Sequence, residues 1–214
     1  VGIIPARYGS TRFPGKPLVE IDGKTMIMRV VERAMSCDRL CDVVVATDDE
    51  RIYNHVIEHG AKAVMTSSEH PSGTDRCLEA FEKWGGEADA VLNIQGDEPF
   101  VAVEQLNALV ELMQNPAVEI ATLAKKIDDQ EVLFDPNKVK VIFSENGRAL
   151  YFSRHAIPFQ KSTPMEEWLG NHTYYKHIGL YAYQLDTLRS ICTLAPSPLE
   201  KMESLEQLRW LENG

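Results

Sequence analysis

Long apolar runs are missing from this sequence of 214 residues. No stretch reaches the roughly 18 apolar residues that mark a membrane-spanning helix. The start of the sequence also lacks the charged and apolar regions of a secretory signal peptide. We therefore expect a cytoplasmic protein without a membrane span.

Paired cysteines are missing as well. The four cysteines (Cys37, Cys41, Cys77 and Cys192) form no CxxC pair, so the spacing of a zinc ribbon or zinc finger is absent. We expect all four to be reduced thiols, as is usual in the cytosol.

Positive charge is in short supply. Lys and Arg number 22 against 32 for Asp and Glu, and the formal net charge is −10. Such a chain repels a polyphosphate backbone, so nucleic acid is not expected as a partner. Any anion site must be a local concentration of basic residues. The apolar fraction of 44% and the charged fraction of 25% are those of a globular protein, and the length fits one α/β domain, with or without an excursion.

The first half of the sequence alternates between buried strands and amphipathic helices. After the first strand we expect a long loop over 5–23. Alternation of this kind predicts a Rossmann-like, mostly parallel sheet with helices on both faces, whose ligand loops gather at the carboxyl ends of the strands. Strands are predicted over 1–4, 42–47, 61–66 and 88–94, and helices over 25–36, 50–59, 73–84 and 103–113.

The pattern becomes richer in strands after Glu119. Asn146-Gly147 is a strong signal for a hairpin turn. We assign 1–127 and 177–214 to the α/β core, and 128–176 to a β-rich excursion that serves as a dimerisation or lid element. Strands are predicted over 120–127, 139–143, 149–152 and 174–183, a loop over 160–171, and helices over 185–194 and 199–211.

A basic, glycine-containing loop follows the first strand directly. Residues 5–17 read PARYGSTRFPGKP and bring Arg7, Arg12 and Lys16 together with Gly9 and Gly15. Glycines let backbone N–H groups approach an anion, and three cations can neutralise a triphosphate. Neither a Walker P-loop nor a GxGxxG fingerprint is present. A solvated basic loop is the alternative, and Arg12 could equally serve in an ion pair.

Two further segments carry polar residues at predicted element ends. Asp97, in QGDEP after the fourth strand, is placed as a carboxylate ligand for Mg²⁺, although it could instead cap the next helix. Ser72 and Thr74, in SGTDR, could cap the helix over 73–84. Arg76 could be an ordinary residue on the surface of that helix.

These motifs resemble the 3-deoxy-manno-octulosonate (Kdo) cytidylyltransferases, or CMP-Kdo synthetases. Besides residues 5–18, SGTDR and QGDEP, the resemblance extends to YFSR at 151–154, KHIGLY at 176–181 and LEQLR at 205–209. It implies Mg²⁺-dependent transfer of CMP from CTP to Kdo for lipopolysaccharide biosynthesis, by a homodimer. It also implies a further segment with a second metal-binding Asp after Gly214, which we expect in a tail outside this sequence.

The resemblance also assigns site residues. It implies that phosphate neutralisation and catalysis fall to Arg7, Arg12 and Lys16, and metal binding to Asp97. Taken alone, the sugar candidates could equally be sheet residues or a solvated helix face. The resemblance places Ala6, Arg7, Lys16, Ser72, Gly73, Arg76 and Gln95 at the nucleotide, and Arg154, His177, Tyr181, Glu206 and Gln207 at the sugar.

Other functions stay open at this point. A cytidylyltransferase for another acidic sugar, of the sialate type, would share the phosphate loop. A non-catalytic nucleotide-binding protein would bind CTP without releasing pyrophosphate, and a purely structural dimer module would bind no nucleotide.

Overall fold

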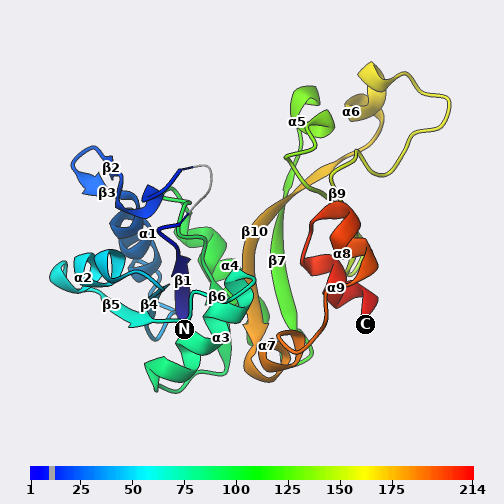
Figure 1. Ribbon diagram of the computed structural model, residues 1–214. Coiled ribbons are helices and arrows are strands. Elements are labelled where there is room, and N and C mark those ends of the chain that lie inside the picture. Colours follow the sequence, from blue (N-terminus) through cyan, green and yellow to red (C-terminus); the bar gives the residue numbers. More distant parts are fainter. Residues whose placement is uncertain (10–12) are drawn as a thin grey trace. The chain divides into compact units, whose positions relative to one another are not determined.

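The structure is a computed structural model that describes residues 1–9 and 13–214, so Arg12 lies outside the described residues. The described chain forms two compact units (Figure 1). Unit 1 is Val1–Ala121 with Leu180–Cys192, and unit 2 is Thr122–Gly179 with Thr193–Gly214. The division differs from the predicted one mainly because the C-terminal segment belongs to unit 2.

Unit 1 is built on a mostly parallel sheet, as predicted. The strand order is β5-β4-β1-β6-β10, and only β10 runs antiparallel, pairing Tyr181 with Asn93. β1 lies in register with β4 through pairs such as Ile3 with Val44. Apolar side chains at these positions are fully buried, which explains the continuous hydrophobic runs. The strands are β1 (Gly2–Ala6), β4 (Val43–Thr47), β5 (Lys62–Met65), β6 (Ala90–Asn93) and the second half of β10 (Tyr175–Gln184).

The predicted helices of unit 1 are present, and α2 and α3 begin at side-chain caps. Asp49 accepts a hydrogen bond from the Arg51 N–H, and Ser72 accepts from the N–H groups of Thr74 and Asp75. The apolar faces of these helices supply buried residues to the core. The helices are α1 (Met26–Met35), α2 (Glu50–Glu58), α3 (Gly73–Trp84), α4 (Val103–Met113) and α7 (Leu185–Ile191).

The loop predicted over 5–23 was wrong in part, because it contains regular structure. A 3₁₀ turn, η1 (Lys16–Leu18), leads into a small hairpin of β2 (Glu20–Ile21) and β3 (Lys24–Thr25). Asp22 and Gly23 both have positive φ at its turn. An Asp-Gly pair is a preferred hairpin turn, so the sequence did carry this signal.

Unit 2 combines strands with short helices. β8 (Lys140–Phe143) and β9 (Ala149–Ser153) form the predicted antiparallel hairpin, which the Ser144 N–H closes by donating to the Arg148 carbonyl at 2.9 Å. β8 also pairs with β10, and β7 (Ile120–Lys126) pairs with β10. The helical elements of unit 2 are α5 (Gln130–Phe134), η2 (Met165–Glu167), α6 (Trp168–Asn171), α8 (Pro198–Glu203) and α9 (Gln207–Glu212).

Two predictions in unit 2 were wrong. The segment 160–171, predicted as a loop, contains η2 and α6, because Trp168 is buried beside Tyr174 in a small apolar cluster. The single helix predicted over 199–211 is broken into α8 and α9 at Ser204, whose φ is 52°. Arg209 pairs with Glu200 across this break, with Nη2 to Oε1 at 2.5 Å.

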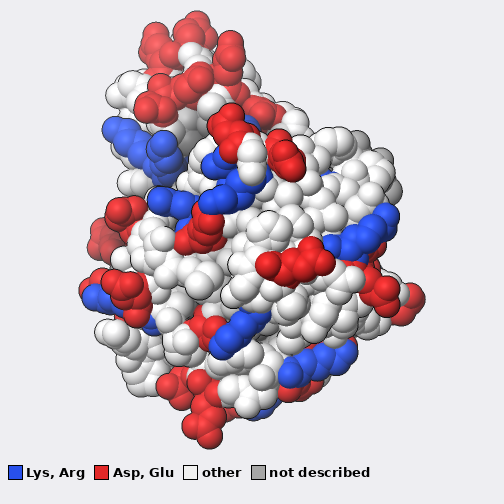
Figure 2. All heavy atoms as spheres, turned by 90° about the vertical axis from the view of Figure 1, so that its left-hand side faces the viewer, with Lys and Arg blue, Asp and Glu red and all other residues white. Residues whose placement is uncertain are grey.

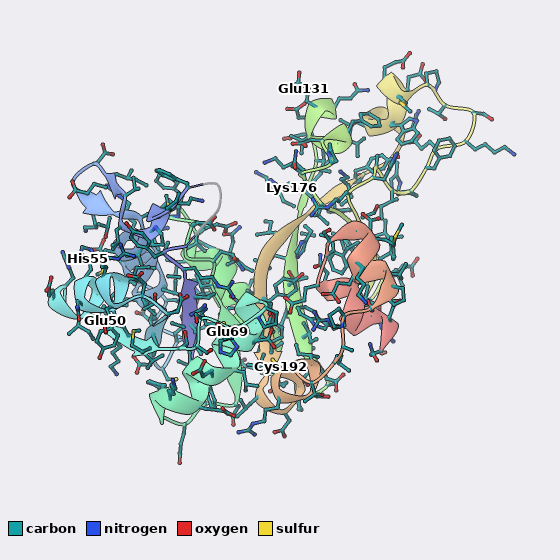
Figure 3. The ribbon with its side chains drawn as sticks, in the orientation of Figure 1. Glu50, His55, Glu69, Glu131, Lys176 and Cys192 are labelled. Atoms are coloured by element: carbon teal, nitrogen blue, oxygen red, sulfur yellow. The ribbon has the colours of Figure 1, made fainter. Side chains whose placement is uncertain are left out.

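The described surface carries charge of both signs (Figure 2), and His55 makes a hydrogen bond. Acidic and basic side chains are interspersed over the face shown in Figure 2. His55 on α2 (Figure 3) bonds to Thr25 through Nε2 and Oγ1 at 2.8 Å, which is a structural role. All four cysteines are free thiols. None of the described helices has the length and apolar character needed to cross a membrane.

Candidate active site

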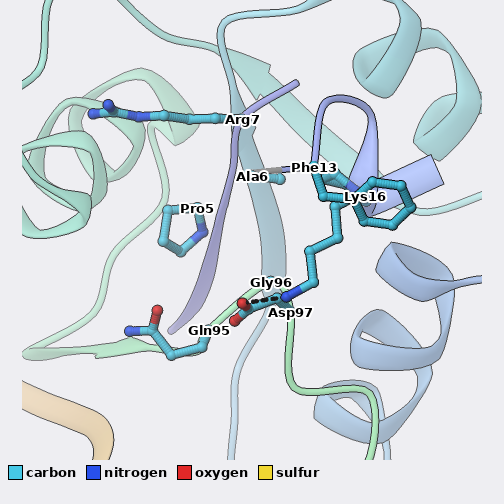
Figure 4. A pocket seen from close by; sticks show the side chains of 9 residues that line it. Pro5, Ala6, Arg7, Phe13, Lys16, Gln95, Gly96 and Asp97 are labelled. Atoms are coloured by element: carbon cyan, nitrogen blue, oxygen red, sulfur yellow. Dashed lines mark hydrogen bonds and ion pairs between the residues drawn. The ribbon is translucent and has the colours of Figure 1, made fainter. Parts of the chain in front are cut away.

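A cavity of about 440 Å³ opens at the carboxyl ends of β1 and β6 (Figure 4). It therefore lies at the edge where a parallel sheet collects its ligand loops. The predicted phosphate loop forms one wall and the QGD segment forms the other. Of the described residues, those lining the cavity are Pro5, Ala6, Arg7, Phe13, Lys16, Pro17, Gln95, Gly96 and Asp97.

Lys16 reaches this cavity because of the turn before it. The Gly15 N–H donates to the Tyr8 carbonyl at 2.9 Å, which closes the loop. Gly15 has a φ of 73°, a left-handed conformation that favours glycine. The 3₁₀ turn then starts at Lys16, and Pro17, the next residue in the cavity wall, is buried. Lys16 Nζ lies 2.6 Å from Asp97 Oδ2.

Asp97 is brought to the same place by a close backbone approach. A Cβ on Gly96 would lie 2.7 Å from the Pro5 carbonyl oxygen, so only glycine lets this segment lie against the end of β1. The Asp97 side chain is 56% exposed. The basic loop that carries Lys16 and the QGD segment that carries Asp97 are far apart in the sequence. They thus meet at this ion pair.

Arg7 lies in the cavity wall but extends away from Lys16 and Asp97 in Figure 4. Its Nη2 donates to the carbonyl oxygen of His70. Ala6 and Gln95 are also in the wall, as expected of residues that contact a nucleotide. The predicted cations Arg7 and Lys16 are therefore both at the cavity, while Arg12 lies outside the described residues.

Hydrogen bonds to Glu79 hold the segment that carries His70. The Glu79 carboxylate accepts from the Ser67 N–H at 2.8 Å, pairs with Lys83 at 2.7 Å, and bonds to the His70 ring. Burial raises the pKa of Glu79, but these partners outweigh burial and lower the pKa to about 2. Glu79 therefore stays ionised at neutral pH and orders the loop whose carbonyl holds Arg7.

Ser72 and Gly73 start helix α3 near the end of β1. The Ser72 hydroxyl caps the helix and donates to Asp75 Oδ2 at 2.6 Å, so the capping alternative is correct for this residue. A Cβ on Gly73 would lie 3.5 Å from the Pro5 ring. Both residues thus lie close to the cavity strand, and their contact with a base stays a prediction.

Arg76 is not the surface residue that the alternative reading supposed, because its side chain is fully buried. Its Nη1 donates to Thr66 Oγ1 at 2.6 Å and lies 3.3 Å from Asp48 Oδ1. Burial lowers the pKa of Arg76. In this conformation the guanidinium ties α3 to the ends of β4 and β5, and direct contact with a nucleotide stays a prediction.

Four of the five sugar candidates belong to unit 2. Arg154 donates through Nε to the Glu203 carbonyl at 2.6 Å, and through its other nitrogens to the carbonyls of Pro136 and Ser204. These bonds fix the break between α8 and α9. A guanidinium has five N–H groups, so three bonds do not use all of them.

The other candidates differ in exposure. Gln207, at the start of α9, is buried, whereas Glu206 is partly exposed. Tyr181 is buried in unit 1. His177 is partly buried, contacts the Phe152 ring edge-on and lies 2.9 Å from Thr122 Oγ1 through Nε2.

The His177 imidazole should make the stability of the protein depend on pH. Burial lowers the pKa of His177 from 6.5 to about 4. Between these values the unfolded chain binds a proton that the folded chain does not, so stability falls as the pH falls from 6.5 to 4. The free energy of unfolding, measured with urea, should fall between pH 7.5 and pH 5 in the wild type. In His177→Gln, whose side chain does not titrate, this fall should be smaller by about 2 kcal/mol.

A matched control is His172→Gln, which removes an exposed histidine of the same unit. It should follow the wild-type pH profile. Parallel profiles for wild type and His177→Gln would show that this imidazole titrates normally in the folded protein.

Comparison with known proteins gives consistent matches over the whole chain. The profile of the family described as "Cytidylyltransferase" matches residues 1–214. A 3-deoxy-manno-octulosonate cytidylyltransferase of Cytophaga hutchinsonii is 54% identical, over 100% of this chain and 86% of its own length. A protein of the same name from Bacteroides thetaiotaomicron is 56% identical, with the same two shares.

Solved structures show the same fold. A CMP:2-keto-3-deoxy-manno-octonic acid synthetase in complex with CTP superposes with a TM-score of 0.92 at 43% identity, covering 100% of this chain and 86% of that one. A cytidylyltransferase from Leptospira borgpetersenii has a TM-score of 0.59 at 18% identity, which shows likeness of fold alone.

Proposed function

Since this chain belongs to the cytidylyltransferase family, we propose that it transfers CMP from CTP to the anomeric hydroxyl of Kdo, forming CMP-Kdo and pyrophosphate. The relatives that are 54% and 56% identical carry the name of this activity, and the relative solved with CTP supports the nucleotide. The product would feed lipopolysaccharide biosynthesis in the cytoplasm of a Gram-negative bacterium.

The observation that carries the proposal is the pair of Lys16 and Asp97 in one cavity at the carboxyl ends of β1 and β6. A reaction at a triphosphate needs cations for the phosphate oxygens and a carboxylate for the accompanying metal. The cavity offers both, next to the Ala6 backbone and the Gln95 amide, which can bond to the edge of a base.

In the proposed reaction, the sugar hydroxyl oxygen attacks the α-phosphorus of CTP. A new O–P bond forms, the bond to the bridging oxygen of the β-phosphate breaks, and pyrophosphate leaves while the hydroxyl releases its proton to solvent. Lys16 and Arg7 would donate to phosphate oxygens and offset the charge that builds up there. Such catalysis rests on positioning and charge neutralisation.

The residues of the cavity fit Mg²⁺ as we expect it to bind. Mg²⁺ is commonly held by one or two carboxylates together with phosphate oxygens and water. Asp97 presents one exposed carboxylate, and the described residues contain no cluster of three or more His, Cys, Asp or Glu that would form a cage made of protein alone. When bound, the ion would neutralise phosphate charge and lower the pKa of a coordinated hydroxyl.

The sugar would use Arg154 for its carboxylate and His177, Tyr181, Glu206 and Gln207 for its hydroxyls. Arginine suits this task because its guanidinium can bind a carboxylate through two parallel bonds. With a lowered pKa, His177 is neutral at neutral pH and can either donate or accept a hydrogen bond.

We also propose that this chain forms a homodimer. Light scattering after size-exclusion chromatography would measure its mass in solution.

The deciding assay is pyrophosphate release with CTP and Mg²⁺ in the presence of Kdo, of N-acetylneuraminate or of no sugar. Release with Kdo alone is the expected result. Release with N-acetylneuraminate instead would favour the sialate reaction. Tight CTP binding without release for any sugar would show a nucleotide-binding protein without transferase activity.

A further inference from the structure

The aromatic ring of Tyr8 connects the phosphate loop to a helix outside the cavity. Tyr8 accepts the backbone hydrogen bond from Gly15 that closes the loop. Its ring also lies against the same glycine: a Cβ on Gly15 would be 3.1 Å from Tyr8 Cζ and 3.1 Å from its hydroxyl oxygen. The position of the ring therefore bears directly on the backbone just before Lys16.

An arginine from helix α2 stacks on the same ring. The Cζ atom of Arg51 lies 3.3 Å from the centroid of the Tyr8 ring, a cation–π contact. The face of an aromatic ring attracts a cation because of its quadrupole, and the planar guanidinium stacks on it well. Arg51 is not among the residues that line the cavity as described.

Arg51 is held in place by its own helix. Its Nε and Nη2 bond to the two carboxylate oxygens of Asp49 at 2.9 and 2.7 Å, which is a bidentate pair. Asp49 in turn caps α2 by accepting from the Arg51 N–H at 3.0 Å. The hydrogen bond from Arg51 lowers the pKa of Asp49, so the carboxylate stays charged at neutral pH. An ion pair in which the arginine is exposed contributes little to stability alone, but here it fixes the guanidinium above the ring.

These contacts form a continuous connection from the cap of α2 to Lys16. We propose that Arg51 is a positioning residue for the triphosphate of CTP. Together with Asp49 and Tyr8 it forms a clamp that holds Gly15, and so places Lys16 opposite Asp97. The inference rests on the proposed function, because it assigns the clamp to the same phosphate site.

The test measures the Kd of CTP by calorimetry, which does not require sugar transfer. Arg51→Ala should raise the Kd about three- to tenfold, with the melting temperature within about 2 °C of wild type. Tyr8→Leu should have an effect of similar size, whereas Tyr8→Phe keeps the ring and should bind nearly as wild type does. The double variant Arg51→Ala/Tyr8→Leu should bind CTP no more weakly than the weaker-binding single variant. Each single substitution already breaks the same connection, so the two effects should not add.

The matched control is Arg189→Ala, which removes an exposed arginine that pairs with Asp186 on α7. It should leave the Kd of CTP unchanged. An unchanged Kd for Arg51→Ala, or effects of the two single variants that multiply in the double variant, would overturn the clamp. Wild-type protein that binds CTP without releasing pyrophosphate would instead contradict the proposed reaction, while the binding constants would still decide the clamp.

Discussion

Lys16→Ala should lower kcat for pyrophosphate release by about a hundredfold or more, in line with the loss of one donor to charge that develops in a transition state. Lys16 projects into the cavity from a turn that Gly15 makes possible, and its ammonium group lies 2.6 Å from Asp97. Lys16→Arg should recover only part of the rate, since the turn positions a compact point charge and a planar guanidinium differs in shape.

The protein supplies a closely matched control for this variant. Lys24 and Glu32 form another exposed ion pair in unit 1, at 2.5 Å, with exposures of 41% and 52% against 34% and 56% for Lys16 and Asp97. Lys24→Ala removes the same charge without touching the cavity, so it should leave kcat at the wild-type value. Equal rates for Lys16→Ala and Lys24→Ala would remove Lys16 from the chemistry.

Asp97→Asn should lower kcat by at least about a hundredfold, because a neutral amide is a poorer ligand for Mg²⁺ and leaves the Lys16 charge uncompensated. The Mg²⁺ concentration for half-maximal activity should rise at the same time. Glu32→Gln is the control, as it neutralises the carboxylate of the matched pair. A wild-type response to Mg²⁺ in Asp97→Asn would exclude this carboxylate as a ligand.

The architecture of unit 1 was predictable because its signals are local. Continuous apolar runs predicted β1, β4, β5 and β6, and all four are present in parallel register apart from small shifts of their ends. The motifs that follow β1 and β6 meet at the cavity for the same reason, since parallel strands that end at one edge bring their loops together. The cavity residues Pro5, Phe13, Pro17 and Gly96 were not predicted as site residues, although they lie inside those motifs.

The parts that could not be predicted depend on partners distant in sequence. The stretch 199–211 has helical spacing throughout, and nothing in it announces the left-handed Ser204; the break is stabilised by Arg154, whose donors reach the carbonyls of Glu203 and Ser204. From the sequence, Arg51 is likewise recognisable only as a residue in the first turn of a predicted helix. Its contact with the Tyr8 ring depends on β1 and β4 being neighbours in the sheet. The sequence predicted a mostly parallel sheet but not the order of its strands.

The order of the strands has a consequence for synthesis on the ribosome. Three neighbouring strands of unit 1, β4, β1 and β6, leave the ribosome early, but the partner of the far edge of β6 is the second half of β10. The chain must therefore emerge as far as Leu180–Gln184 before that edge is paired. Until then the nascent protein displays an open apolar strand, the kind of edge on which other chains can add. The segment Thr122–Gly179, inserted between the two parts of unit 1, therefore lengthens the time for which this edge of β6 is unpaired.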